Sequence, residues 1–173
     1  MLEVSKKSEE KRYREWFRQK ELKTMFKKPV IFLDIDGVLN SDEWYNSDYN
    51  PGNLNGREGD IDPSCVKRLN RICKECHAEV VISSDWKINF SSTISRLSNA
   101  GFLGRIVGKT PRLNAIRGEE IEAFVNENSI TRYVIIDDRT DFLPSQKSHF
   151  VHTDHRFGLT DKDADKAIFI LNL

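Results

Sequence analysis

The sequence is poor in cysteine, proline and long apolar runs, and each shortage excludes a class of protein. Its 173 residues include only three Cys and five Pro. An odd number of Cys with no sign of an extracellular context does not describe a disulfide framework. No apolar run approaches the ~20 residues that cross a bilayer. The N-terminus is charged with no apolar stretch behind it, so we expect no secretory signal, no membrane association and a cytoplasmic location.

The chain also has no net charge, but its two parts differ. Residues 1–28 carry a net charge of +5 and residues 29–173 a net charge of −5. A basic arm on an acidic body could contact nucleic acid, although we prefer a solvated helix that touches its own body. At roughly 150 residues per domain, the length predicts one domain with an appendage. We therefore assign 1–28 to a basic helical arm and 29–173 to the main domain.

Short apolar runs alternate with helical patterns along the main domain. Several runs lack polar alternation, which is typical of strands buried on both faces of a parallel sheet. Strands are expected at 30–33, 79–82, 102–107, 133–136 and 150–153. Helices are expected at 91–99 and 118–128. A further helix should start at Asp62-Pro63 and include Cys76, and a last helix, opened by a capping box of Thr160 and Asp163, should include Leu171. The alternation predicts an α/β three-layer sandwich with a mainly parallel central sheet.

One segment of the main domain, residues 40–61, matches neither pattern. It is rich in Asn, Gly, Asp and Tyr, and we expect a long irregular excursion of a kind that is often functional. Its aromatic residues Trp44, Tyr45 and Tyr49 could stack on a base or sugar. They could equally pack the loop onto the body, and both interpretations stay open.

Polar residues follow three of the apolar runs directly, at 34–37, 83–85 and 137–138. Ligands of open parallel sheets bind outside the carboxyl ends of the strands, so the four carboxylates in these segments should converge. Carboxylates at close range repel one another, and a cation should compensate. Hard oxygen ligands suit Mg²⁺, which is often shared with a substrate phosphate. A carboxylate can also act as a nucleophile and form an aspartyl phosphate.

These motifs resemble those of a known family, the haloacid dehalogenase-like (HAD) phosphohydrolases. Val30–Asn40 is similar to the first motif, an apolar strand followed by Asp-x-Asp-Gly-[Val/Thr]. Val80–Ser83 is similar to the second, and Val134–Asp138 to the fourth. A Lys or Arg is expected as the third, and Lys109 and Arg117 are both candidates. The resemblance implies a HAD-like Rossmannoid fold and leaves only the N-terminal arm unexplained.

The resemblance also implies roles for individual residues. Asp34 would attack the phosphorus, and Asp36 would protonate the leaving oxygen and then activate water. Mg²⁺ would be held by the Asp34 carboxylate, the Asp36 main-chain carbonyl and Asp137. Asp138 would ligate through water or orient the site. Ser83 would donate a hydrogen bond to the transferring phosphoryl group.

The cation that neutralises this group would be Arg117 or Lys109. We prefer Arg117, since it begins the helix before the strand of the fourth motif. Lys109 precedes a Thr-Pro step, which is similar to the Lys-Pro step of many relatives. Gly37, Ser84 and Trp44, which lie in or beside the motifs, are expected to contact the substrate.

The family's large cap domains have no room in this chain. The segment 40–61 holds only a loop or hairpin, and 83–117 about one helix and one strand. An open site favours a bulky substrate such as a phosphorylated nucleic-acid end or a protein, although small capless relatives also hydrolyse small phosphomonoesters. Ile82–Trp86 and the Asp-Gly-Val-Leu-Asn run also resemble HAD domains linked to RNA repair. Together with the basic arm, this favours a nucleic-acid end.

The predicted function is therefore a Mg²⁺-dependent phosphatase that forms an aspartyl phosphate. One alternative is a non-catalytic HAD-fold binding or scaffold protein whose N-terminal arm holds the partner. Another is a phosphotransferase of the same fold with an acceptor other than water. Asp36 argues against a dehalogenase.

Overall fold

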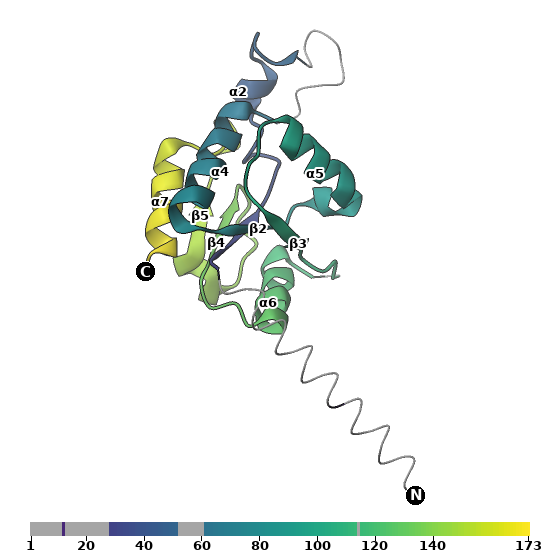
Figure 1. The fold of residues 1–173 in the computed structure, drawn as a ribbon, viewed down its shortest axis with the longest axis vertical. Coiled ribbons are helices and arrows are strands. Elements are labelled where there is room, and N and C mark those ends of the chain that lie inside the picture. Colours follow the sequence, from purple (N-terminus) through teal and green to yellow (C-terminus); the bar gives the residue numbers. More distant parts are fainter. Residues whose placement is uncertain (1–11, 13–27, 52–60, 114) are drawn as a thin grey trace, which may run out of the picture.

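The computed structural model describes residues 12, 28–51, 61–113 and 115–173. The predicted arm at 1–28 therefore lies almost entirely outside the described residues. The rest forms an α/β sandwich, with helices on both faces of a central parallel sheet (Figure 1). This confirms the predicted fold class. Within the described ranges, no helix is long and apolar enough to cross a membrane.

The sheet has five strands in the order β3-β2-β1-β4-β5, and every pairing is parallel. The strands are β1 (Val30–Leu33), β2 (Glu79–Ile82), β3 (Ile106–Lys109), β4 (Tyr133–Asp137) and β5 (Phe150–His152). In the centre, Leu33 of β1 lies opposite Ile82 of β2 and Ile136 of β4. This register places the residues that follow all three strands at one edge of the sheet.

The helices cover the sheet on both faces and bury its alternating side chains. They are α2 (Asp42–Tyr45), α4 (Pro63–Cys76), α5 (Phe90–Asn99), α6 (Arg117–Asn128) and α7 (Asp161–Leu171), with 3₁₀ helices η1 (Asp85–Asn89) and η2 (Pro144–His149). Ile31 and Leu33 share one apolar core with α4, α5 and α7. Val30 and Phe32 point to the other face, where α6 covers them. The two-residue alternation of β1 thus supplies both cores.

Local sequence signals explain where the main helices begin. Asp62 caps α4 by accepting a hydrogen bond from the Ser64 amide, and Pro63 occupies the first helical position. Thr160 and Asp163 form a capping box at the start of α7. Both starts were predicted from the sequence and are confirmed.

Two segments differ from the sequence prediction. The third strand begins at Ile106 rather than at 102, because Asn70 of α4 accepts a hydrogen bond from the Leu103 amide and donates one to the Gly101 carbonyl. These bonds hold the chain in a turn before the strand. The predicted irregular segment 40–61 contains one helical turn, α2, which Ser41 caps, and its residues 52–60 lie outside the described residues.

Candidate active site

The carboxyl ends of β1 and β4 bring three acidic side chains together. One oxygen from each of Asp34, Asp137 and Asp138 lies within 4.8 Å of the others. Asp34 is 3% exposed and Asp137 is fully buried, whereas Asp138 is half-buried. Because β1 and β4 are hydrogen-bonded neighbours, their parallel register alone accounts for this convergence. Three carboxylates in this arrangement offer hard oxygen ligands to a divalent cation.

The first residue of α6, Arg117, contacts two of these carboxylates. Its Nη1 lies 2.7 Å from Oδ2 of Asp34 and 2.6 Å from Oδ2 of Asp137. The side chain is 7% exposed, and burial acts to lower its pKa. Asp34 and Asp137 outweigh this effect and raise the pKa of Arg117 above its ordinary value. The guanidinium therefore stays charged but compensates for only one of three negative charges.

The surplus negative charge is reflected in the pKa of Asp137, which is raised above its ordinary value. Burial raises the pKa of Asp137, and the neighbouring Asp34 carboxylate raises it further. Arg117 and the Arg139 amide act in the opposite direction but do not cancel the rise. A group held with excess negative charge in a desolvated place is stabilised by a bound cation. The residues present therefore fit a divalent metal ion such as Mg²⁺.

The other candidate for the third motif, Lys109, lies apart from the carboxylates. Its ammonium donates a 2.9 Å hydrogen bond to the Lys87 carbonyl and sits 5.4 Å from the centre of the Phe90 ring. Of the two cations that the sequence offered, the structure therefore brings Arg117 and not Lys109 to Asp34. The choice between them depended on side-chain direction, which the sequence spacing does not specify.

A buried ion pair supports the position of Arg117. Lys87 of η1 contacts Glu120, in the first turn of α6, and also donates to Thr110 Oγ1 at 3.0 Å. Both side chains of the ion pair are at least nine-tenths buried. The pair therefore joins the segment after β2 to the helical turn that Arg117 begins. Sequence analysis did not identify Lys87, because nothing in its spacing indicates this contact.

Two donors from different parts of the chain hold the carboxylate of Asp36. Asn40 Nδ2 donates to Oδ1 at 2.9 Å, and Trp86 Nε1 donates to Oδ2 at 2.9 Å. Asn40 Nδ2 also lies 2.8 Å from the Tyr45 hydroxyl. These contacts give the exposed Asp36 carboxyl a fixed direction at the mouth of the site. Asn40 was not among the expected site residues, although it is the last residue of the first motif. The position of Trp86 directly after the second motif left both a site role and a core role open, and its hydrogen bond to Asp36 places it at the site.

The two serines after β2 have different surroundings. Ser83 is buried, and its hydroxyl has no hydrogen-bond partner among the described residues. Ser84 is also buried, but its hydroxyl accepts a hydrogen bond from the Trp86 amide and so caps η1. A buried hydroxyl without a partner has an unmet hydrogen bond, which a bound ligand can complete. Ser83 is therefore better placed than Ser84 to contact one.

Gly37 and Trp44, the other residues expected to contact the substrate, differ in their surroundings. Gly37 has a φ of +69°, and a Cβ there would collide with the Asp138 carboxylate. Its amide donates to Asn40 Oδ1 at 2.8 Å. Trp44 lines a separate hollow together with Tyr49. Gly37 therefore allows the first and fourth motifs to approach each other closely, and Trp44 lines a hollow that none of the three clustered carboxylates lines.

Comparison with known families places these motifs in context. Residues 30–164 match the model of the HAD domain in Swiss Army Knife RNA repair proteins. Neither the curated proteins nor the solved structures contain a match to this chain. The matched range includes every acidic residue of the site as well as Ser83 and Arg117. The chain therefore belongs to the family of HAD domains found in Swiss Army Knife RNA repair proteins.

Proposed function

We propose that this protein is a Mg²⁺-dependent phosphatase that removes the phosphate from a phosphorylated nucleic-acid end through an aspartyl phosphate on Asp34. The observation that carries the proposal is the contact of Arg117 with Asp34 and Asp137 beside a third carboxylate. HAD domains generally act as phosphohydrolases. A buried carboxylate, a fixed cation and surplus negative charge are the groups that phosphoryl transfer needs for positioning and charge neutralisation.

Mg²⁺ would be held by Asp34 and Asp137, with Asp138 as a third acidic neighbour and the Asp36 carbonyl as an expected ligand. When bound, it would supply positive charge against the phosphoryl oxygens. Arg117 would add a second positive charge, because its guanidinium is permanently charged and offers several N–H donors. The Ser83 hydroxyl, which lacks a partner among the described residues, would donate to a phosphoryl oxygen.

In the first step, a carboxylate oxygen of Asp34 attacks the phosphorus. A new bond forms between this oxygen and phosphorus, while the bond from phosphorus to the leaving oxygen breaks. The protonated carboxyl of Asp36 gives its proton to the leaving oxygen, so the product departs as an alcohol. Trp86 and Asn40 would hold Asp36 in the direction that this transfer requires.

In the second step, the phosphoryl group passes from Asp34 to water. The Asp36 carboxylate, which has lost its proton, accepts one from a water molecule as the water oxygen bonds to phosphorus. The bond between phosphorus and the Asp34 oxygen then breaks and inorganic phosphate is released. Both residues return to their starting protonation states, so the cycle is balanced.

The nucleic-acid end is favoured by the open edge of the sheet and by the family. The chain between β2 and α6 forms only η1, α5 and β3, and the described part of the segment after β1 forms only α2. Neither contains a separate cap domain among the described residues. The family model describes domains of RNA repair proteins. A macromolecular phosphate end could approach such a site without the opening of any lid formed by the described residues.

The test compares the wild type with Asp34→Asn on p-nitrophenyl phosphate and on a short RNA with a terminal phosphate. We expect Mg²⁺-dependent phosphate release that falls by at least about 10³-fold in the variant, since the nucleophile is lost. Asp48→Asn, at an exposed position outside the carboxylate cluster, is the matched control and should keep wild-type activity. Activity that survives in Asp34→Asn would overturn the nucleophile assignment. A wild type inactive on both substrates would favour the binding-protein alternative.

A further inference from the structure

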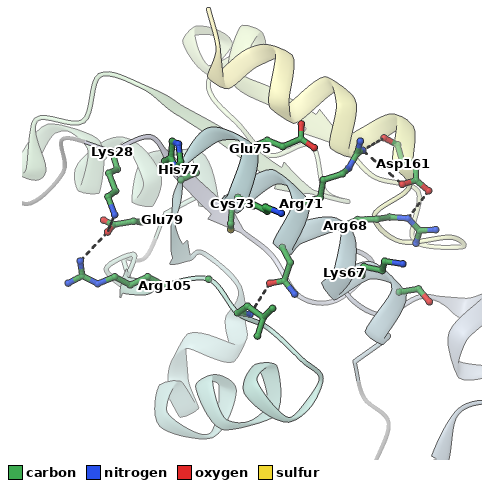
Figure 2. A pocket seen from close by; sticks show the side chains of 16 residues that line it. Lys28, Lys67, Arg68, Arg71, Cys73, Glu75, His77, Glu79, Arg105 and Asp161 are labelled. Carbon is green, nitrogen blue, oxygen red and sulfur yellow. Dashed lines mark hydrogen bonds and ion pairs between the residues drawn. The ribbon is translucent and has the colours of Figure 1, made fainter.

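A groove of about 1090 Å³ runs along α4 (Figure 2), and no carboxylate of the site lines it. One wall is α4 itself, and the other includes the chain that leads into β3 and the residues at the start of β1 and β2. Because α4 follows β1 and precedes β2, it begins at the edge of the sheet that carries the site and ends at the opposite edge. Its 14 residues span ~21 Å, so the groove follows one side of the domain between these two edges.

Positive charge is concentrated in this groove. Three acidic residues line it, namely Glu75, Glu79 and Asp161. Its basic lining residues are Lys28, Lys67, Arg68, Arg71, Lys74 and Arg105. All of these cations except Lys28 belong to residues 29–173, which as a whole carry a net charge of −5, so this cationic surface is a local feature. A groove of this sign attracts a chain of phosphates.

One acid, Glu79, is shared between two cations and balances only one of them, whereas Asp161 and Asp165 together balance Arg68 and Arg71. Glu79 is buried and contacts Lys28 at 3.5 Å and Arg105 at 3.1 Å, from opposite sides in Figure 2. Asp161 contacts Arg68 at 3.1 Å and lies 3.9 Å from Arg71. Arg71 also pairs with Asp165, on the next turn of α7, at 2.8 Å.

Two further lysines leave the groove with a cationic surplus. Lys67 and Lys74 are exposed, and neither has an ion pair within the described part of the chain. They lie seven residues apart on α4, which is about two helical turns, so both project from the same side of the helix. Phosphates in the groove could therefore contact both ammonium groups.

A second hollow adjoins the groove and is lined in part by the segment that follows β1. Its volume is about 460 Å³, and it shares Ser64 and Arg68 with the groove. Ser41, one of its lining residues, follows the asparagine that holds Asp36. Three aromatic residues also line it, namely Trp44, Tyr49 and Phe157. Tyr49 is 89% exposed and Phe157 is 50% exposed. Exposed aromatic faces stack on the bases of single strands regardless of sequence.

From this continuity we propose that the groove along α4 binds the phosphate backbone of single-stranded RNA whose phosphorylated end lies at Asp34. The aromatic hollow would take bases next to that end. RNA is favoured over DNA because the matched family belongs to RNA repair proteins. The proposal rests on the phosphatase function and adds the path of the substrate and the residues that hold it.

The test is fluorescence anisotropy with a short, labelled, single-stranded RNA that has hydroxyl ends and so cannot be turned over. The full chain is used as wild type, as the double variant Lys67→Glu/Lys74→Glu, and as the control Lys147→Glu/Lys162→Glu. The control makes the same charge change at exposed positions outside the groove. We expect the groove variant to raise Kd about tenfold or more at about 50 mM salt and to reduce the slope of log K against log salt.

Site chemistry is followed in the same preparations with p-nitrophenyl phosphate. A molecule of this size bound at Asp34 is too small to contact the groove lysines as well, so both double variants should keep wild-type kcat/KM. Equal Kd values for the groove variant and its control would overturn the proposal that the groove binds RNA, without affecting the proposed phosphatase function. Tighter binding of DNA of the same sequence would overturn the assignment to RNA. The wild type could also bind RNA but lack phosphatase activity. If the groove variant then lost RNA binding, the result would support the groove as an RNA-binding surface and overturn the proposed phosphatase function.

Discussion

The indole nitrogen of Trp86 donates a 2.9 Å hydrogen bond to Oδ2 of Asp36. The two residues follow different strands, since Asp36 comes after β1 and Trp86 lies in η1 after β2. Asn40 holds the other oxygen of the same carboxylate. The direction of the proposed general acid therefore depends on the pairing of β1 with β2 as well as on its own motif.

Trp86→Phe should separate the packing of this aromatic side chain from its hydrogen bond to Asp36. The variant keeps an aromatic side chain but removes the N–H donor to Asp36. We expect kcat to fall about tenfold on a phosphorylated RNA end, whose leaving oxygen needs a proton. p-Nitrophenyl phosphate should be nearly unaffected, because its leaving group departs without one. Steady-state kinetics on both substrates check this, and an equal loss on the two would contradict the positioning role.

Arg117→Lys should impair the site even though it preserves the charge. A lysine cannot reproduce the planar guanidinium that reaches both Asp34 and Asp137, so kcat/KM should fall by about tenfold or more. Arg139→Lys is the matched control, since Arg139 is half-exposed and pairs with Asp141. The assignment of the third motif to Arg117 fails if Arg117→Lys behaves like the control, and Lys109→Ala would then be the variant to measure.

The raised pKa of Asp137 predicts how pH affects the metal-free protein. The folded state binds a proton on Asp137 more tightly than the unfolded state, whose pKa lies near 3.8. Rising pH between 3.8 and the folded value therefore lowers the free energy of unfolding. Asp137→Asn should flatten this dependence in thermal melts with chelator. Mg²⁺ affinity should increase over the same pH window, because the metal needs the ionised carboxylate.

Gly37→Ala should weaken Mg²⁺ binding at the site as well as lower the stability of the protein. Gly37 has a φ of +69°, and the added Cβ would collide with the Asp138 carboxylate. Gly101 offers a matched control, since its φ is +90° but no atom lies within 4 Å of an added Cβ. Both variants should lose about 1 kcal/mol of stability through the backbone. Only Gly37→Ala should also weaken Mg²⁺ binding, measured by calorimetry; equal affinities in the two variants would rule out the steric effect.

Much of this fold could be predicted from the sequence because its signals are local. The runs of buried-type residues mark β1, β2 and β4, and Asp62-Pro63 marks the start of α4. The convergence of Asp34 with Asp137 also followed from the sequence, since parallel strands end at one edge. The boundary of β3 did not, because Asn70, on another element, holds the chain in a turn before it.

The sequence by itself determined the α/β fold and which strand ends carry acidic residues, since strand periodicity and helix capping depend on neighbours in the chain. The tertiary structure decided that Arg117 and not Lys109 reaches Asp34, that Trp86 holds Asp36, and that the cations of α4 line a groove. These are contacts between side chains of separate elements. Their formation depends on helix rotation and side-chain direction after packing, which residue spacing does not specify.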